Sequence, residues 1–194
     1  MKEPILEKIL RRVRLSRVLP YINKESRMLD IGCGWDAKLL REVSPIIRDG
    51  FGIDFKIDLS IPSPSNIQFL QKRFDQESLP FANQSFDIVT LLAVLEHIEP
   101  IRVDFVLNEV KRVLKRGGKL LLTVPTPSAK PVLEFLSFKL GLINRDEILD
   151  HKLYYSKHLL HETLIRNGYK IQRYRFFQLR MNSFCAAISE GIPV

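Results

Sequence analysis

Cysteine pairs and long hydrophobic runs are both missing from this sequence of 194 residues. Cys33 and Cys185 are the only cysteines, too few for a disulfide framework and without the spacing of a metal site. The longest apolar stretch, Ile88 to Leu95, contains Thr90 and is far shorter than the roughly 20 residues that a membrane helix requires. The first residues mix charged and aliphatic side chains, unlike a secretory signal. We therefore expect no membrane span and a cytoplasmic location.

The composition is that of a folded protein with an excess of positive charge. Hydrophobic residues make up 45% and charged residues 27%, which predicts a single folded domain over residues 1–194. Lys and Arg number 30 against 22 Asp and Glu, so the formal net charge is +8. This charge is compatible with an anionic partner.

Many basic residues gather in the first segment, where residues 4–20 have the apolar spacing of an amphipathic helix. One interpretation is a helix whose basic face is solvated. The alternatives are a peripheral contact with an anionic membrane surface, a nucleic-acid contact, and a cap over a cofactor site. The sequence leaves these open, and it is compatible with a monomer or a homodimer.

Alternating strands and helices follow the basic segment. A continuous apolar run over residues 85–92 is typical of a strand buried on both faces, and we expect it at the centre of the sheet. A helical stripe over 101–114 precedes Gly117 and Gly118, which predict the end of that helix. This order predicts a doubly wound, Rossmann-like α/β fold with a mostly parallel sheet. Further strands are expected at 27–31, 50–53, 67–74 and 119–124, with a further helix at 37–43.

Residues 126–150 interrupt this alternation. They contain two prolines, a short apolar segment that predicts a helix around 132–140, and an acidic patch. We interpret them as a small lid insertion on the substrate side. A helix is expected again at 156–166, and two β-like runs at 169–179 and 183–189 predict a C-terminal antiparallel hairpin.

A glycine turn between the first strand and its helix indicates a nucleotide site, because glycines let backbone amides approach a ligand at a helix N-terminus. Residues 32–37 satisfy the relaxed pattern G-x-G-x-x-G/A, so the turn alone does not distinguish NAD from S-adenosylmethionine. Asp54 ends the second strand 20 residues after Gly34, where a carboxylate can accept the hydroxyls of an adenosine ribose. The alternative is that Asp54 only caps a turn.

Five ordered segments give a more specific match. Residues 28–34, 52–54, 74–81, 85–98 and 113–123 resemble, in this order, the motifs of the class I S-adenosylmethionine-dependent methyltransferases. The resemblance covers roughly residues 28–125. The sequence departs from the family pattern at Asp36, where the family often has a third glycine, although Gly32 and Gly34 remain for the close approach to the ligand.

The resemblance implies S-adenosylmethionine as the cofactor and assigns its contacts. Asp30 faces the amino-acid end of the cofactor in this assignment, Asp54 its ribose and Asp75 its adenine amino group. These roles agree with the chemistry of carboxylates, which accept hydrogen bonds from ammonium, hydroxyl and amino groups. The other expected contacts are the loop residues Gly32, Cys33 and Gly34, the ring of Phe55 against adenine, the backbone amide of Gln76, and Leu92.

Methyl transfer from a sulfonium needs alignment and exclusion of water more than a nucleophilic side chain. A hydroxyl acceptor must lose a proton, which an imidazole can take. His97, just beyond the fourth strand, is the first catalytic candidate, and His151 with Tyr154 follows the lid. The alternatives are a structural His97 and a His151 that anchors the lid. His158 and His161 lack a third ligand at a recognisable spacing, so we expect no metal site.

The sequence therefore predicts an enzyme that transfers a methyl group to a small-molecule, sugar or metabolite acceptor, at oxygen. One alternative is RNA methylation, which the charge favours. The segment Leu92-Ala93-Val94-Leu95 lacks the Asn-Pro-Pro-Tyr type of motif, which argues against methylation of base amino groups. Two further candidates from different classes are a non-catalytic cofactor-binding protein and a nicotinamide dehydrogenase.

Overall fold

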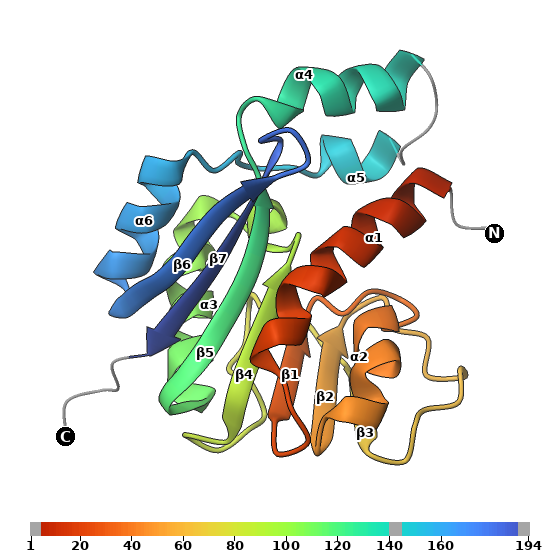
Figure 1. Ribbon diagram of the computed structural model, residues 1–194, viewed down its shortest axis with the longest axis vertical. Helices are drawn as coiled ribbons and strands as arrows, with labels where there is room; N and C mark the ends of the chain where they lie inside the picture. The colour runs from red at the N-terminus through yellow and green to blue at the C-terminus, as the bar shows by residue number, and fades with distance from the viewer. Residues whose placement is uncertain (1–4, 140–144, 190–194) are drawn as a thin grey trace.

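The computed structural model describes residues 5–139 and 145–189 (Figure 1). The strands are β1 (Arg27–Ile31), β2 (Asp49–Asp54), β3 (Ile67–Gln71), β4 (Phe86–Leu92), β5 (Leu114–Pro125), β6 (Tyr169–Phe177) and β7 (Asn182–Ser189). The α-helices are α1 (Ile5–Val18), α2 (Lys38–Val43), α3 (Pro100–Val113), α4 (Ala129–Glu134), α5 (Arg145–Leu149) and α6 (Lys157–Arg166). Short 3₁₀ turns are η1 (Leu19–Tyr21), η2 (Ser44–Ile46) and η3 (Leu95–His97), and η4 (Phe135–Lys139) is a π-helix.

The strands form one seven-stranded sheet in the order β3-β2-β1-β4-β5-β7-β6. The pairs from β3 to β5 are parallel, whereas β7 is antiparallel to both β5 and β6. The mostly parallel, doubly wound α/β sheet and its C-terminal antiparallel hairpin are confirmed. β4 lies between β1 and β5, as its continuous apolar run predicted.

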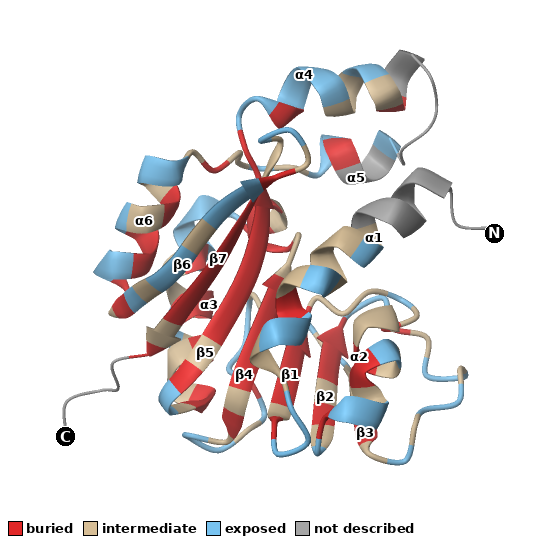
Figure 2. Ribbon diagram, in the orientation of Figure 1, coloured by how far each residue is buried: buried red, intermediate tan, exposed pale blue. Residues whose placement is uncertain are grey.

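Helices cover both faces of the sheet. Successive residues of a strand point to opposite faces, so each central strand presents apolar side chains to the helices on both sides. In β1, Leu29 belongs to the core cluster on the α3 and α6 face, and its neighbour Met28 to the cluster on the α1 and α2 face. β4 repeats this with Val89 and Ile88. Figure 2 shows the result, with the central strands buried along most of their length and the outer helix surfaces exposed.

The helix predicted over 101–114 is present as α3, but the role given to the glycine pair after it and the end of the third strand are wrong. Gly117 and Gly118 do not end α3, because the helix stops at Val113 and β5 begins at once. The register between β4 and β5 shifts between Phe86 and Ile88, so the glycine pair forms a bulge within the strand. A Cβ on Gly118 would lie 2.8 Å from the carbonyl oxygen of Lys115, which explains the glycine there. The predicted strand 67–74 also ends early, at Gln71.

The expected lid contains α4, η4 and α5, which lie beyond the end of the sheet where β5 finishes (Figure 1). The helix expected around 132–140 begins earlier, at Ala129, and Leu140 lies outside the described residues.

The expected N-terminal helix is present as α1, and Val18 at its end is fully buried against the sheet. Position 4 of that prediction also lies outside the described part. None of the helices in the described part is long and apolar enough to cross a membrane.

Candidate functional site

The glycine turn after β1 meets the loop after β4. Gly32 has a φ of 71°, and its backbone N–H donates to the carbonyl oxygen of Ile53 at 2.8 Å. A Cβ on Gly32 would lie 2.4 Å from Cγ2 of Val94, so the two loops touch where no side chain fits. Gly34 has a φ of 76°, and a Cβ there would meet no atom within 4 Å. The turn is therefore packed on one side and open on the other.

Asp54 is buried at the end of β2, beside this turn. Its Oδ2 accepts the backbone N–H of Gly34 at 2.9 Å, and its Oδ1 accepts that of Lys56 at 2.8 Å. The carboxylate does cap a turn, and the same bonds hold it against the glycine loop. Each oxygen retains a further lone pair for a ligand hydroxyl.

Asp30 is 3% exposed in β1. The hydroxyl of Thr90 in β4 donates to its Oδ1 at 2.6 Å. Burial raises the pKa of Asp30 to about 7, the Thr90 bond opposes this rise, and the nearby Asp54 charge adds to it. A buried carboxyl of this kind is stabilised as the carboxylate by an ammonium group.

The other expected cofactor residues line the same end of the sheet to different degrees. Phe55 is 45% exposed, and the Nζ atom of Lys56 and the guanidinium of Arg73 lie over its ring, 5.0 and 5.2 Å from the centroid. Cys33, Asp75 and Leu92 are half-buried and Gln76 is exposed. Burial raises the pKa of the Cys33 thiol, so it stays neutral.

Asp36, the departure from the family pattern, is held within the loop. Its Oδ2 pairs with Nζ of Lys38 at 2.9 Å, and its carbonyl oxygen accepts Nε of Arg41 at 2.7 Å. These contacts stabilise the turn without a third glycine. Trp35 beside it is 54% exposed.

The three expected catalytic residues, His97, His151 and Tyr154, lie together. The rings of His97 and His151 meet edge to face with centroids 4.8 Å apart. Nδ1 of His97 lies 3.1 Å from Oδ2 of Asp150, and Nδ1 of His151 lies 3.0 Å from the Tyr154 hydroxyl. Burial, followed by the effect of His97, lowers the pKa of His151 to about 4, and burial raises that of Tyr154. His158 and His161 lie apart from them on α6.

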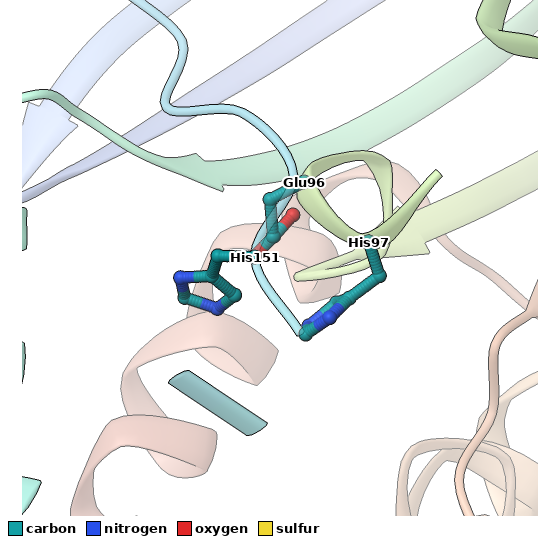
Figure 3. A group of neighbouring side chains, drawn as sticks. All are labelled: Glu96, His97 and His151. Carbon is teal, nitrogen blue, oxygen red and sulfur yellow. The ribbon is translucent and has the colours of Figure 1, made fainter. Parts of the chain in front are cut away.

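Sequence reasoning missed Glu96, the residue before His97 in η3. Its side chain is 1% exposed, and burial raises its pKa to about 7. Glu96, His97 and His151 each place a carboxylate oxygen or ring nitrogen within 4.8 Å of the others. Figure 3 shows these side chains, which we call the histidine cluster, gathered between η3 and the segment after α5. A carboxylate inside an otherwise apolar run was the available signal.

A cavity of about 510 Å³ adjoins the histidine cluster. It is formed by α4, α5 and the segment that follows α5, and it is within the 300–1,000 Å³ range of small-ligand sites. Polar and charged side chains contribute to its wall. They include Lys130, Glu134, His151, Lys152 and Tyr154.

Comparison with known sequences gives one family. The sequence profile described as a methyltransferase domain matches residues 6–174. An uncharacterized methyltransferase of Bacillus subtilis, YcgJ, is 35% identical over 116 residues, which are 57% of this chain and 45% of that protein. The chain thus spans about half the length of the first curated relatives it matches, 52% in one and 45% in another.

Solved structures agree on the fold. A SAM-dependent methyltransferase from Methanosarcina mazei aligns with a TM-score of 0.68 at 20% identity, covering 91% of this chain and 98% of that one. An S-adenosylmethionine-dependent methyltransferase from Mesorhizobium loti aligns with a TM-score of 0.67 at 17% identity, covering 90% and 95% of the two chains.

Proposed function

The chain belongs to the class I S-adenosylmethionine-dependent methyltransferases, and we propose that it methylates an oxygen of a small-molecule, sugar or metabolite acceptor. The observation that supports this most is the contact of Gly32 in the glycine turn with Val94 in the loop that carries part of the histidine cluster. His151 of this cluster also lines the 510 Å³ cavity. A cofactor on one side and an acceptor on the other can meet there.

The residues around the turn fit the cofactor. Bound S-adenosylmethionine supplies an electrophilic methyl group on a sulfonium. In this proposal the buried carboxyl of Asp30 binds the ammonium of the cofactor, Asp54 binds the ribose hydroxyls, and Phe55 packs on the adenine. Asp75 and Gln76 bind the adenine edge. The open space over Gly34 supports close approach of the ligand to the backbone. Cys33 and Leu92 complete the wall.

The acceptor is proposed to bind in the 510 Å³ cavity, whose wall carries hydrogen-bonding side chains suited to a hydroxylated molecule. His97, oriented by Asp150, takes the acceptor proton, and His151 with Tyr154 positions the hydroxyl. A relative from Amycolatopsis mediterranei, named 27-O-demethylrifamycin SV methyltransferase, is 29% identical over 154 residues. Its name supports oxygen as the methylated atom.

Residues 126–150 are proposed to act as the lid of this cavity. Pro127, Lys130 and Glu134 from one half and Ile148 and Leu149 from the other line it. A cover of this kind excludes water from the reacting groups, which methyl transfer requires.

RNA is the second candidate acceptor. The net charge of +8 favours it, as does a similarity of 30% over 112 residues to a Gallus gallus protein named tRNA N(3)-cytidine methyltransferase METTL2. That similarity covers only 29% of the relative, so the small-molecule acceptor remains our proposal.

Two measurements test the proposal. Calorimetric titration is expected to show binding of S-adenosylmethionine and no binding of NAD. Methyl transfer from labelled cofactor is then measured with a panel of hydroxylated metabolites and sugars, and separately with total tRNA. Incorporation only into tRNA would replace the small-molecule acceptor by RNA. Binding without any transfer would favour a different use of the fold, which a [4+2]-cyclase, SpnF, also has at a TM-score of 0.71.

A further inference from the structure

We propose that Glu96, His97 and His151 bind a divalent transition-metal ion. Their ligand atoms lie within 4.8 Å of one another, from two segments that only the fold brings together (Figure 3). Ligands about 2.1 Å from a common ion lie roughly 3 to 3.5 Å apart, so small side-chain rotations complete the site. One carboxylate and two imidazoles form the ligand set of many catalytic zinc and non-haem iron sites, which keep other positions open.

The buried oxygen of Glu96 is the second observation. Oε2 of Glu96 is buried and accepts no hydrogen bond from any residue in the described ranges. A carboxylate oxygen left this way costs roughly 1 to 3 kcal/mol or more, so a native protein rarely retains one without a partner. Arg14 of α1 acts on Glu96 by its charge, yet it makes no hydrogen bond to Oε2. A metal ion bound to Oε2 supplies the missing partner.

The surroundings of the two histidines match those of metal ligands. Histidines that bind metals donate their other ring N–H to a carboxylate, hydroxyl or carbonyl oxygen, which fixes the ring and its tautomer. Asp150 lies at such a distance from Nδ1 of His97, and the Tyr154 hydroxyl from Nδ1 of His151. With the protons on Nδ1, the lone pair of each ring is on Nε2.

The role of the ion, as distinct from its binding, rests on the proposed function. His151 lines the acceptor cavity, so an acceptor hydroxyl can occupy an open position on the ion. Coordination lowers the pKa of the hydroxyl, and its proton passes to solvent. The oxygen then forms the O–CH₃ bond while the S–CH₃ bond breaks, and the electron pair stays on sulfur as a neutral thioether. An imidazole whose lone pair binds the ion cannot also act as a free base. With the ion bound, His97 is therefore a ligand and does not take the acceptor proton.

Binding is tested with Co²⁺ alone, on tag-free full-length protein stripped with a chelator. We expect one equivalent to bind with the visible absorption of a protein-bound Co²⁺ site, and Zn²⁺ to displace it. Glu96→Gln and His151→Gln are each expected to weaken binding by about tenfold or more. His158→Gln is the control, because His158 forms an exposed pair with Glu162 at 3.1 Å outside the cluster.

Cofactor affinity and circular dichroism show whether each variant folds. No spectrum in the wild-type protein, or a spectrum lost in His158→Gln and kept in both folded cluster variants, would overturn the proposal. Metal binding and methyl transfer are measured separately. Specific Co²⁺ binding without methyl transfer would support the metal site and contradict the proposed function. Transfer that resists chelation, with no metal bound, removes the metal site and leaves His97 as the proposed base.

Discussion

The proposed cofactor side of the site and its proposed acceptor side are assembled differently. On the cofactor side, Asp30, the glycine turn and Asp54 lie within 25 residues of chain that form two adjacent strands. On the acceptor side, His97 and Asp150 are 53 positions apart and meet across two loops. Both sides hold a buried carboxyl whose pKa burial raises to about 7, Asp30 and Glu96. Asp30 has the Thr90 hydroxyl as its partner, whereas Oε2 of Glu96 has none in the described part of the chain.

This difference shows that different interactions hold the two sides in place. Parallel strand pairing fixes the cofactor side, and its hydrogen bonds are made before any ligand arrives. The acceptor side depends on a few long-range contacts between loops, which is where local opening requires least free energy. Changes on the acceptor side should therefore affect turnover, and changes on the cofactor side should affect affinity and stability.

The largest expected effect is on the lid. Replacing residues 129–149 by a Gly-Ser linker of equal length removes α4 and α5 from the cavity wall, and we expect methyl transfer to be lost. The affinity for S-adenosylmethionine should stay within about threefold, or roughly 0.6 kcal/mol. Titration and a turnover assay measure the two. Hydrogen exchange gives an independent check, and amides of α4 as protected as those of β4, with and without cofactor, would contradict a lid.

His97→Ala should lower turnover by about 10²- to 10⁴-fold with little change in cofactor affinity, because the group that handles the acceptor proton is lost. Steady-state kinetics with an identified acceptor measures this. His158→Gln on the exposed face of α6 is the matched control and should leave turnover unchanged. A structural His97 would instead lower the melting temperature and reduce binding and turnover together. Near-wild-type turnover of folded His97→Ala would shift attention to His151 and Tyr154.

The contact between the two sides is tested at the glycine turn. Gly32→Ala places a Cβ against Val94 at a φ of 71°, and we expect a loss of about 2 to 4 kcal/mol in the free energy of unfolding. Gly34→Ala has a similar φ and open space, so about 1 kcal/mol of backbone strain is expected. Chemical denaturation compares them. Adding Val94→Ala should recover part of the first loss, and equal stability of the two single variants would refute the contact.

Asp54→Asn should weaken S-adenosylmethionine binding about ten- to hundredfold, or 1.5 to 3 kcal/mol, through loss of a charge-assisted bond to the ribose. The asparagine keeps an oxygen for the N–H of Gly34 or Lys56, so the turn is largely preserved. Asp58→Asn is the control, because Asp58 is half-buried and its carboxylate accepts local hydrogen bonds from the backbone N–H and the hydroxyl of Ser60. Calorimetry on both folded variants measures the effect. Unchanged affinity in Asp54→Asn would remove the ribose assignment.

The smallest effect concerns the pH dependence of cofactor binding. With its pKa raised to about 7, Asp30 is mostly protonated below pH 7, and an ammonium ligand must displace that proton. Affinity should therefore rise roughly tenfold between about pH 5.5 and pH 7, and Asp30→Asn should flatten the rise. Calorimetry across this range checks it, and an equally steep rise in the variant would exclude Asp30.

The raised pKa of Asp30 also makes the stability of the fold depend on pH. Because the pKa of folded Asp30 lies above its unfolded value of 3.8, the folded state holds a proton that the unfolded state releases. The contribution of Asp30 to stability thus falls as the pH rises from about 4 to 7. Asp30→Asn should gain stability relative to the wild type over that window, as measured by denaturation without cofactor.

Features carried by short stretches of sequence were predicted well. The apolar run of β4, the glycine turn and Asp54 depend on local spacing, so the sheet and the position of the turn could be predicted. The glycine pair at 117–118, expected to stop the helix, shows the limit of that reasoning. Glycine favours both a helix end and a strand bulge, and only pairing with β4 decides between them.

By itself, the sequence determined the order of strands and helices, because side-chain periodicity acts within a few residues. It also placed Asp30 and Asp54, two of the candidate cofactor carboxyls, at strand ends. Only the tertiary structure brought His151 and Asp150 to His97 and buried Glu96 between them. Contacts over 53 positions leave no period in the sequence, and burial of a carboxylate depends on everything packed around it.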